Sequence, residues 1–202
     1  MDNNSYSEIT PEILKLAAMS EKAGIIDTEL FTKYEVKRGL RDLNGKGVLA
    51  GLTNISDVRA TKTENGAQVP DHGRLFYRGY DVKDLVGGLP KDEAFGFEEA
   101  TYLLLFDKLP SHQELESFKQ MLAGYRTLPT SFVRDIIMKA PSKDMMNTLA
   151  RSVLTLYSYD DRADDTSLPN VLRQCLQLIS LFPLLSIYGY QAYSHYHDGN
   201  SL

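Results

Sequence analysis

The densest group of possible metal ligands in this sequence is an acidic cluster of four aspartates, Asp160, Asp161, Asp164 and Asp165. Carboxylate oxygens are the ligands that hard cations prefer. The cluster lacks the alternating oxygen ligands, the central glycine and the terminal glutamate of a calcium loop. We therefore predict a solvated turn that caps the following helix, and no metal site.

The four histidines are the next candidates for chemistry. His195 and His197 flank Tyr196, and residues two apart on a helix point away from each other, so the pair does not form a zinc site. His72 is predicted in a turn and His112 in the first turn of a helix. Neither has a neighbouring carboxylate or nucleophile arranged to activate it. We assign no catalytic role to any of the four.

Three basic residues, Arg38, Arg41 and Lys46, cluster around flexible glycines. Guanidinium and ammonium groups bind phosphate, so a phosphate contact is one interpretation of this cluster. A solvated basic loop is the other. The glycines of this stretch are not followed by Lys-Ser or Lys-Thr, which excludes the usual phosphate loop of nucleotide-binding proteins.

Composition limits the class of protein. The chain has 202 residues, of which 43% are hydrophobic and 24% charged, with a net charge of -5, which is typical of a globular protein and gives no basic footprint for nucleic acid. The one cysteine, Cys175, lies in an apolar helical pattern, which predicts a buried structural thiol in a reducing compartment. The first residues resemble neither a secretory signal nor a transit peptide, so we expect a cytoplasmic protein.

The order of elements is read from caps, breaks and periodicity. Thr10-Pro11 starts a first helix that Gly24 ends, and Asp27 caps a shorter one. Two β-rich runs, Val48–Ser56 and Arg74–Tyr80, predict a small hairpin with a polar connection. From Asp81 onward the pattern is helical, so the fold class is mainly α.

The later helices have clear boundaries. Ser111 and Glu114 form a capping box, with Phe118 and Leu122 on the buried face of the helix that follows. Asp144 to Tyr157 predicts an amphipathic helix. The stretch Leu168 to His195 is apolar on more than one side, with a break expected at Phe182-Pro183. Its longest apolar run, 176–190, is too short and too polar for a membrane span.

Several runs in the right order resemble the citrate synthase family, and the Tyr-Arg-Gly-Tyr motif at 77–80 is the most specific of them. The others are Arg38-Gly-Leu-Arg41, residues 48–56, Gly73–Leu85, Phe97–Pro110, residues 144–154, and Phe182-Pro183 with the Tyr-rich helix after it. The resemblance covers residues 38–202. It implies a multi-helical large domain, present in part, with residues 1–37 forming N-terminal helices before it.

The resemblance also implies a function. Citrate synthases condense acetyl-CoA with oxaloacetate on a homodimer, using a carboxylate base and a neutral histidine donor. No motif of this sequence matches the family's catalytic histidine and aspartate segments, so we expect no catalytic residue in this chain and no activity from it alone. Arg41 aligns with a basic position near the acetyl-CoA phosphates. Acetyl-CoA enters as a substrate, and no cofactor or metal is expected.

Two alternatives stay open from the sequence. The first is a 2-methylcitrate synthase, because in the family the acyl-CoA specificity is set largely by residues beyond Leu202. A catalytically silent helical module, which binds a partner or dimerises through its apolar helices, is the reading from another class of protein.

Overall fold

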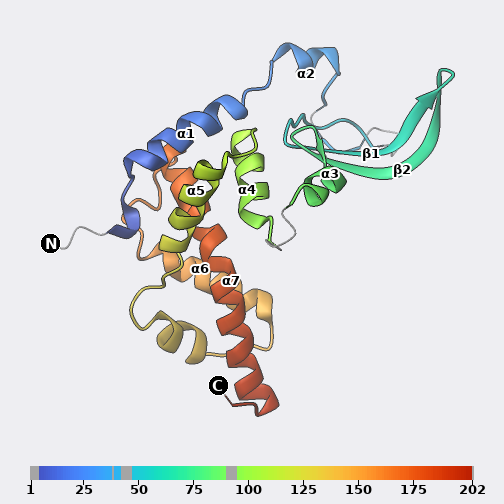
Figure 1. Cartoon of the computed structure of the whole chain (residues 1–202). Helices are drawn as coiled ribbons and strands as arrows, with labels where there is room; N and C mark the ends of the chain where they lie inside the picture. Colours follow the sequence, from blue (N-terminus) through green and yellow to red (C-terminus); the bar gives the residue numbers. More distant parts are fainter. Residues whose placement is uncertain (1–4, 38, 42–46, 90–94, 202) are drawn as a thin grey trace. The chain divides into compact units, whose positions relative to one another are not determined.

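The computed structural model describes residues 5–37, 39–41, 47–89 and 95–201. The chain divides into two compact units, one formed by Met1–Ala17 and Glu116–Leu202 and the other by Ala18–Leu115. We call them the first and the second unit. The first unit is largely helical, and the second combines short helices with a small sheet; Figure 1 labels the α-helices and the two long strands. The boundary at residue 37, between the N-terminal helices and the large domain, stays a prediction.

The first unit contains most of the long helices. They are the first part of α1 (Pro11–Ala23), most of α5 (His112–Gly124), the π-helical turn η2 (Val133–Met138), α6 (Met145–Tyr157) and α7 (Leu168–Asp198). A short 3-10 turn, η1 (Ser5–Ser7), precedes them. The core of this unit packs η2 and α6 against α7 through Phe132, Ile137, Leu156, Leu181 and Leu185.

The predicted helix starts are confirmed. The Thr10 hydroxyl accepts a hydrogen bond from the Ile13 amide at 3.3 Å. Ser111 and Glu114 form both bonds of the capping box, at 3.3 and 2.9 Å, and Asp144 accepts from two amides of α6. These bonds satisfy backbone donors that a helix leaves without partners in its first turn.

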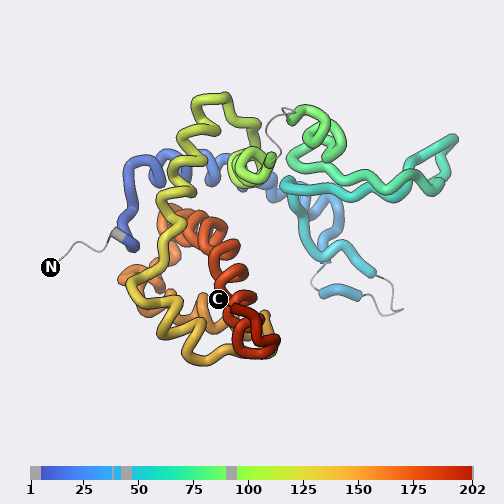
Figure 2. Tube along the Cα trace, turned by 60° about the horizontal axis from the view of Figure 1, so that its bottom comes forward, coloured from blue at the N-terminus to red at the C-terminus, as the bar shows by residue number. Residues whose placement is uncertain are grey.

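The break expected at Pro183 is wrong, because α7 continues through it as one helix of 31 residues (Figure 2). A proline removes one backbone hydrogen bond, but buried residues on either side, Leu181 and Leu185, hold both halves in the core. By length and composition alone α7 could cross a membrane, although 39% of its apolar window is buried inside the structure. The run 176–190 is expected to be too short to span a membrane, but the whole helix α7 is long enough.

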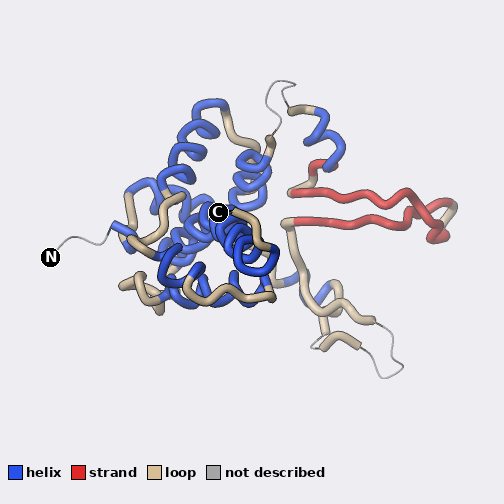
Figure 3. The backbone as a smooth tube through the Cα atoms, turned by 90° about the horizontal axis from the view of Figure 1, so that it is seen from below, coloured by secondary structure: helices blue, strands red, loops and turns tan. Residues whose placement is uncertain are grey.

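The second unit contains a three-stranded antiparallel sheet in the order β1-β2-β3. Its strands are β1 (Ser56–Glu64), β2 (Ala67–Tyr77) and β3 (Tyr80–Asp81), and its helices are the end of α1, α2 (Glu29–Lys33), α3 (Val82–Gly87) and α4 (Phe97–Phe106). Figure 3 shows the long β1-β2 ribbon reaching beyond the short strand β3. Every residue of β1 is exposed.

The hairpin exists, but its predicted position is only partly right: the run Arg74–Tyr80 lies in β2, its turn and β3, whereas the first run does not form the other strand. Residues 48–55 form no strand, and the polar stretch taken as the connection forms the ribbon itself. Asn65 and Gly66 form its turn with φ angles of 50° and 79°, the conformation that an Asn-Gly pair favours in a two-residue hairpin loop. Both faces of the outer ribbon are exposed, so the sequence there has no alternation of apolar and polar residues to reveal the strands.

Candidate functional site

Arg41, the one binding residue that the sequence singles out, is exposed in the second unit. It forms an isolated antiparallel bridge with Gly47, and the Lys37 amide donates to the Leu49 carbonyl at 2.8 Å. This places Arg41 at the surface, where a phosphate could reach it. Arg38 and Lys46, its predicted neighbours, lie outside the described residues.

The histidines lie at scattered positions. The prediction of a turn at His72 is wrong, because His72 is exposed within β2. His112 begins α5 as predicted, and His195 and His197 occupy the last turn of α7. His195 Nδ1 is 2.8 Å from the Asn200 carbonyl oxygen. Within the described residues, no group of three or more His, Cys, Asp and Glu side chains could hold a metal ion.

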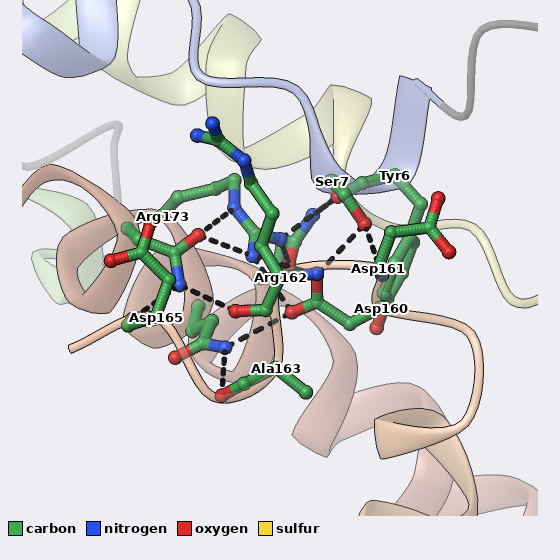
Figure 4. Close-up of polar contacts among 11 residues, drawn as sticks. Tyr6, Ser7, Asp160, Asp161, Arg162, Ala163, Asp165 and Arg173 are labelled. Carbon is green, nitrogen blue, oxygen red and sulfur yellow. Dashed lines mark hydrogen bonds and ion pairs between the residues drawn. The ribbon is translucent and has the colours of Figure 1, made fainter. Parts of the chain in front are cut away.

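The most extensive polar network of the first unit centres on Arg173, which sequence reasoning missed. Arg173 belongs to α7, and its side chain is fully buried. Its Nη2 lies 2.7 Å from Asp160 Oδ2 and 2.9 Å from Oδ1. Nε and Nη2 also donate to the Asn170 side chain, and Nη1 to that of Gln177. All three guanidinium nitrogens therefore bond to protein oxygens (Figure 4).

Asp160 is the carboxylate that balances this buried charge. Burial alone would raise its pKa, but hydrogen bonds from Arg173, Gln174 and Ser7 outweigh burial and lower the pKa to about 2. The carboxylate is ionised at neutral pH and fully engaged, so it is a poor proton acceptor. The prediction of a solvated turn is wrong for Asp160, whose side chain is 8% exposed. It fits Asp165, which accepts from the Ser167 amide just before α7.

The N-terminal segment completes the network. The Tyr6 carbonyl accepts from Arg173 Nη1 at 2.9 Å and from the Gln177 side-chain Nε2 at 2.6 Å. The Ser7 hydroxyl donates to Asp160 at 2.8 Å and accepts from the Asp161 amide at 2.9 Å. Burial and the nearby Asp160 carboxylate raise the pKa of the Tyr6 phenol. The network thus ties three distant stretches of sequence together.

A pocket of about 250 Å³ adjoins the network inside the first unit. Its walls are mostly apolar, and Asp160, Gln174 and Gln177 supply polar groups. The apolar side is formed by Val153, Leu154, Leu156, Ala163 and Leu178. Asp160 and Gln177 already bond to Arg173, so the pocket supplies neither a free base nor a nucleophile from these groups.

A signal for the network exists in the sequence. Asn170, Arg173, Gln177 and Ser180 follow one another at three- and four-residue steps in an otherwise apolar helix, and all four are at most 3% exposed. A polar stripe on the inner face of a helix predicts a buried network, because buried polar groups need partners. The same helix corrects the prediction for Cys175, which is exposed rather than buried.

Similarity to known proteins decides the family. Residues 42–201 match the family described as "Citrate synthase, C-terminal domain". The chain belongs to the citrate synthase family. The resemblance to this family, carried most specifically by Tyr77-Arg-Gly-Tyr80, is confirmed.

The relatives of this chain include both citrate synthases and 2-methylcitrate synthases. The chain is 30% identical over 154 residues to a 2-methylcitrate synthase of Shewanella oneidensis, an alignment that covers 74% of this chain and 35% of that protein. It is 33% identical over 132 residues to a citrate synthase of Haloferax volcanii, covering 64% and 29%. The chain thus spans about a third of the length of these curated relatives.

Solved structures support the fold. The citrate synthase of Pyrobaculum aerophilum aligns with a TM-score of 0.57 at 24% identity, covering 76% of this chain and 38% of that one. The citrate synthase of Thermoplasma acidophilum, solved as a ternary complex with carboxymethyl coenzyme A and oxaloacetate, aligns with a TM-score of 0.57 at 19% identity, covering 79% and 36%. The multi-helical citrate synthase fold expected from the sequence is confirmed.

Proposed function

We propose that this chain forms the N-terminal part of a citrate synthase, which condenses acetyl-CoA with oxaloacetate and water to give citrate and CoA. The match of residues 42–201 to the citrate synthase family carries the choice of family, and the N-terminal placement rests on the resemblance of the sequence runs alone. The complex of the Thermoplasma relative with a CoA derivative and oxaloacetate supports the choice of substrates.

The chemistry explains why we propose that the chain is inactive alone. The reaction begins with removal of a proton beside the thioester carbonyl, which needs a carboxylate base and a donor that stabilises the enolate oxygen. Among the described residues, the carboxylate nearest the pocket of the first unit is Asp160, which is bound to Arg173. We propose that the base and the histidine donor come from the rest of the enzyme, and that this chain provides its scaffold.

Arg41 has a proposed role in substrate binding. It is exposed in a basic, glycine-containing loop, and a guanidinium on a CoA phosphate forms a charge-assisted hydrogen bond worth about 1.5–3 kcal/mol. We propose that Arg41 contacts a phosphate of acetyl-CoA.

The decisive experiment measures release of the CoA thiol from acetyl-CoA and oxaloacetate. The 202-residue chain is assayed alone and mixed with a separately expressed C-terminal part of the enzyme. Activity of the mixture and none of the chain alone supports the proposal. Turnover by the chain alone would refute the proposed division of catalytic groups, and silence of a well-folded mixture would favour a non-catalytic module.

The active mixture also tests Arg41. Arg41→Gln should raise the KM for acetyl-CoA about tenfold and leave kcat and the KM for oxaloacetate unchanged, because the phosphate lies far from the reacting carbon. The matched control is Arg134→Gln, an exposed arginine of the first unit paired with Asp135. Equal kinetics of the two variants would remove Arg41 from the binding site.

A second candidate function is that of a 2-methylcitrate synthase. This chain is 30% and 31% identical to 2-methylcitrate synthases of two bacteria. That product carries an extra methyl group, so its thioester substrate has one more carbon than acetyl-CoA. The ratio of kcat/KM for the two thioesters in the active mixture distinguishes the candidates.

We also propose that the complete protein is a cytoplasmic homodimer. The exposed apolar residues of α7 support association, since Ile187 and Tyr190 are 61% and 56% exposed. Sedimentation equilibrium of the mixture tests the dimer.

A further inference from the structure

The Tyr77-Arg-Gly-Tyr80 motif forms a tight turn with an unusual residue in it. Tyr77 and Tyr80 are paired across β2 and β3, and Arg78 and Gly79 between them have φ angles of 46° and 85°. A two-residue loop with positive φ at both positions favours Asn-Gly or Gly-Gly, because an L side chain such as arginine strains there. Backbone strain of this kind persists only where other interactions over-determine it.

The Arg78 side chain supplies those interactions. It is 3% exposed, and its Nε and Nη2 donate to the Leu104 carbonyl at 3.1 and 2.8 Å. Nη1 donates to the Ala23 carbonyl at 3.0 Å and to the Asn54 side-chain oxygen at 2.8 Å. One guanidinium therefore binds three separate segments of the second unit.

Two of these acceptors lie at helix ends. Ala23 is the last residue of α1, and Leu104 lies in the last turn of α4. The carbonyls at the end of a helix lack intrahelical partners and carry partial negative charge, so a buried cation is favourable there. The carboxylate of Asp107, just after α4, is 3.9 Å away. These contacts explain why an arginine occupies a turn position that suits asparagine.

The third contact closes a loop. The Asn54 side-chain Nδ2 donates to the same Ala23 carbonyl at 2.9 Å, so Ala23 and Asn54 are held together at the two ends of segment 24–53. This segment contains Arg41. Asn54 and Arg78 thus form a clasp at its base, anchored on α4.

We propose that Arg78 is a positioning residue, which clasps the ends of segment 24–53 against α4 and thereby fixes the paired residues 39–41 and 47–49 that present Arg41. The link from the clasp to acyl-CoA rests on the proposed function. The clasp itself does not, because each of its contacts lies within this chain.

Hydrogen exchange on the 202-residue chain tests the clasp directly. Arg78→Asn gives the turn a residue that suits it better and removes the clasp. We expect the Tyr34 and Lys37 amides, which are bonded within segment 24–53, to exchange roughly tenfold faster or more, since bonds to a charged group are lost. The amides of α7 should keep their rates. Unchanged exchange in segment 24–53 would overturn the clasp.

The other hairpin turn provides a matched control. Asn65 and Gly66 have φ angles of 50° and 79°, close to those of Arg78 and Gly79. Asn65→Arg therefore places the same strained residue in the same turn without a clasp, and should leave exchange in segment 24–53 unchanged. Faster exchange there in this control would mean that turn strain, not the side chain, controls the loop, which would overturn the proposal.

Two further variants keep the proposal falsifiable if Arg78→Asn folds poorly. Asn54→Ala should accelerate the same amides, because it removes the other half of the clasp, and combining it with Arg78→Asn should add little. Arg78→Lys should not restore slow exchange, since one ammonium cannot reproduce the planar fork of donors. Full rescue by lysine, or additive effects of the two substitutions, would overturn the clasp geometry.

Kinetics of the active mixture test the link to substrate. Arg78→Lys should raise the KM for acetyl-CoA several-fold and leave the KM for oxaloacetate unchanged. An equal rise of both values, together with faster exchange in segment 24–53, would retain the clasp and reject its link to Arg41. A mixture without activity bears on the proposed function instead, and the exchange result then decides the clasp alone.

Discussion

Each unit of the molecule buries an arginine, and the two are compensated differently. The Arg173 side chain is 0% exposed and pairs with Asp160 at 2.7 Å. The Arg78 side chain is 3% exposed, but its nearest carboxylate, on the half-exposed Asp107, is 3.9 Å away. Its close partners are the backbone carbonyls of Ala23 and Leu104 and the amide oxygen of Asn54.

The Arg173 and Arg78 sites show two ways to compensate a buried guanidinium. In the first unit a full negative charge balances Arg173, and two side-chain amides and the Tyr6 carbonyl accept from the remaining donors. In the second unit the partial charges at two helix ends do the same for Arg78. A buried charge whose partner is removed is strongly destabilising, so the two arginines should respond very differently when the neighbouring carboxylate is neutralised.

The largest effect is expected for Asp160→Asn, which keeps the shape of the side chain and removes its charge. It should lower the free energy of unfolding by roughly 3 kcal/mol or more, because Arg173 is left buried without a counter-charge. Asp107→Asn, the matched change beside Arg78, should cost less than about 0.5 kcal/mol. Urea unfolding followed by circular dichroism measures both. Similar losses in the two variants would refute the distinction between the arginines.

The contrast also separates what the sequence could predict. Caps are local, so Ser111 with Glu114, and Asp144, could be found from residues three apart. The family resemblance followed from the order of short runs along the chain. The position of the ribbon could have been predicted from Asn65-Gly66, a strong turn signal that the β-rich composition of residues 48–56 outweighed.

Partners distant in sequence could not be found this way. Arg173 bonds to the Tyr6 carbonyl, 167 residues away, and no local pattern pairs two such segments. The polar stripe of α7 indicates that partners exist but does not identify them. Arg78 could be recognised as part of a family motif, whereas its role requires knowing that the ends of α1 and α4 meet the turn.

Low pH should lower the free energy of unfolding through Asp160, the partner of Arg173. Hydrogen bonds to Asp160 lower its pKa from 3.8 to about 2 in the folded protein. A depressed pKa contributes stability that is present above about pH 4 and is lost as the pH falls towards 2. This loss should amount to about 1–2 kcal/mol.

Urea unfolding at pH 4.5 and pH 2.5 measures it, with Asp160→Asn as the control that lacks the titrating group. Hydrogen bonds from Lys108 and from Ser111 also lower the pKa of Glu114 to about 2, and that contribution remains in both proteins. An equal loss in wild type and variant would show that Asp160 does not set the acid sensitivity.

A smaller effect is expected at Ser7, which joins the N-terminal segment to Asp160. Ser7→Ala removes the bond to the carboxylate and the acceptor of the Asp161 amide, at a cost of about 1 kcal/mol. Hydrogen exchange at the Asp161 amide should accelerate, while the amides of segment 24–53 should not change. Ser158→Ala, at an exposed serine after α6, is the control, and an equal response there would mean that the Ser7 contacts contribute nothing.

The smallest effect is expected where an ion pair is equally short but exposed. Lys62 and Glu64 lie 2.6 Å apart on β1, with side chains 49% and 55% exposed. Their separation matches that of Arg173 and Asp160 to within 0.1 Å. Water screens the exposed pair and solvates either partner when the other is lost, so Glu64→Gln should change the free energy of unfolding by less than about 0.5 kcal/mol.

Burial, rather than the distance between charges, therefore sets the expected difference between Glu64→Gln and Asp160→Asn. Added salt should reduce the small contribution of the exposed pair and leave that of the buried pair nearly constant, because screening acts through the solvent. Urea unfolding of both variants at low and high ionic strength measures this. A salt-sensitive loss at Asp160, or a loss of several kcal/mol at Glu64, would show that solvent reaches the Arg173 network as freely as it reaches the ribbon.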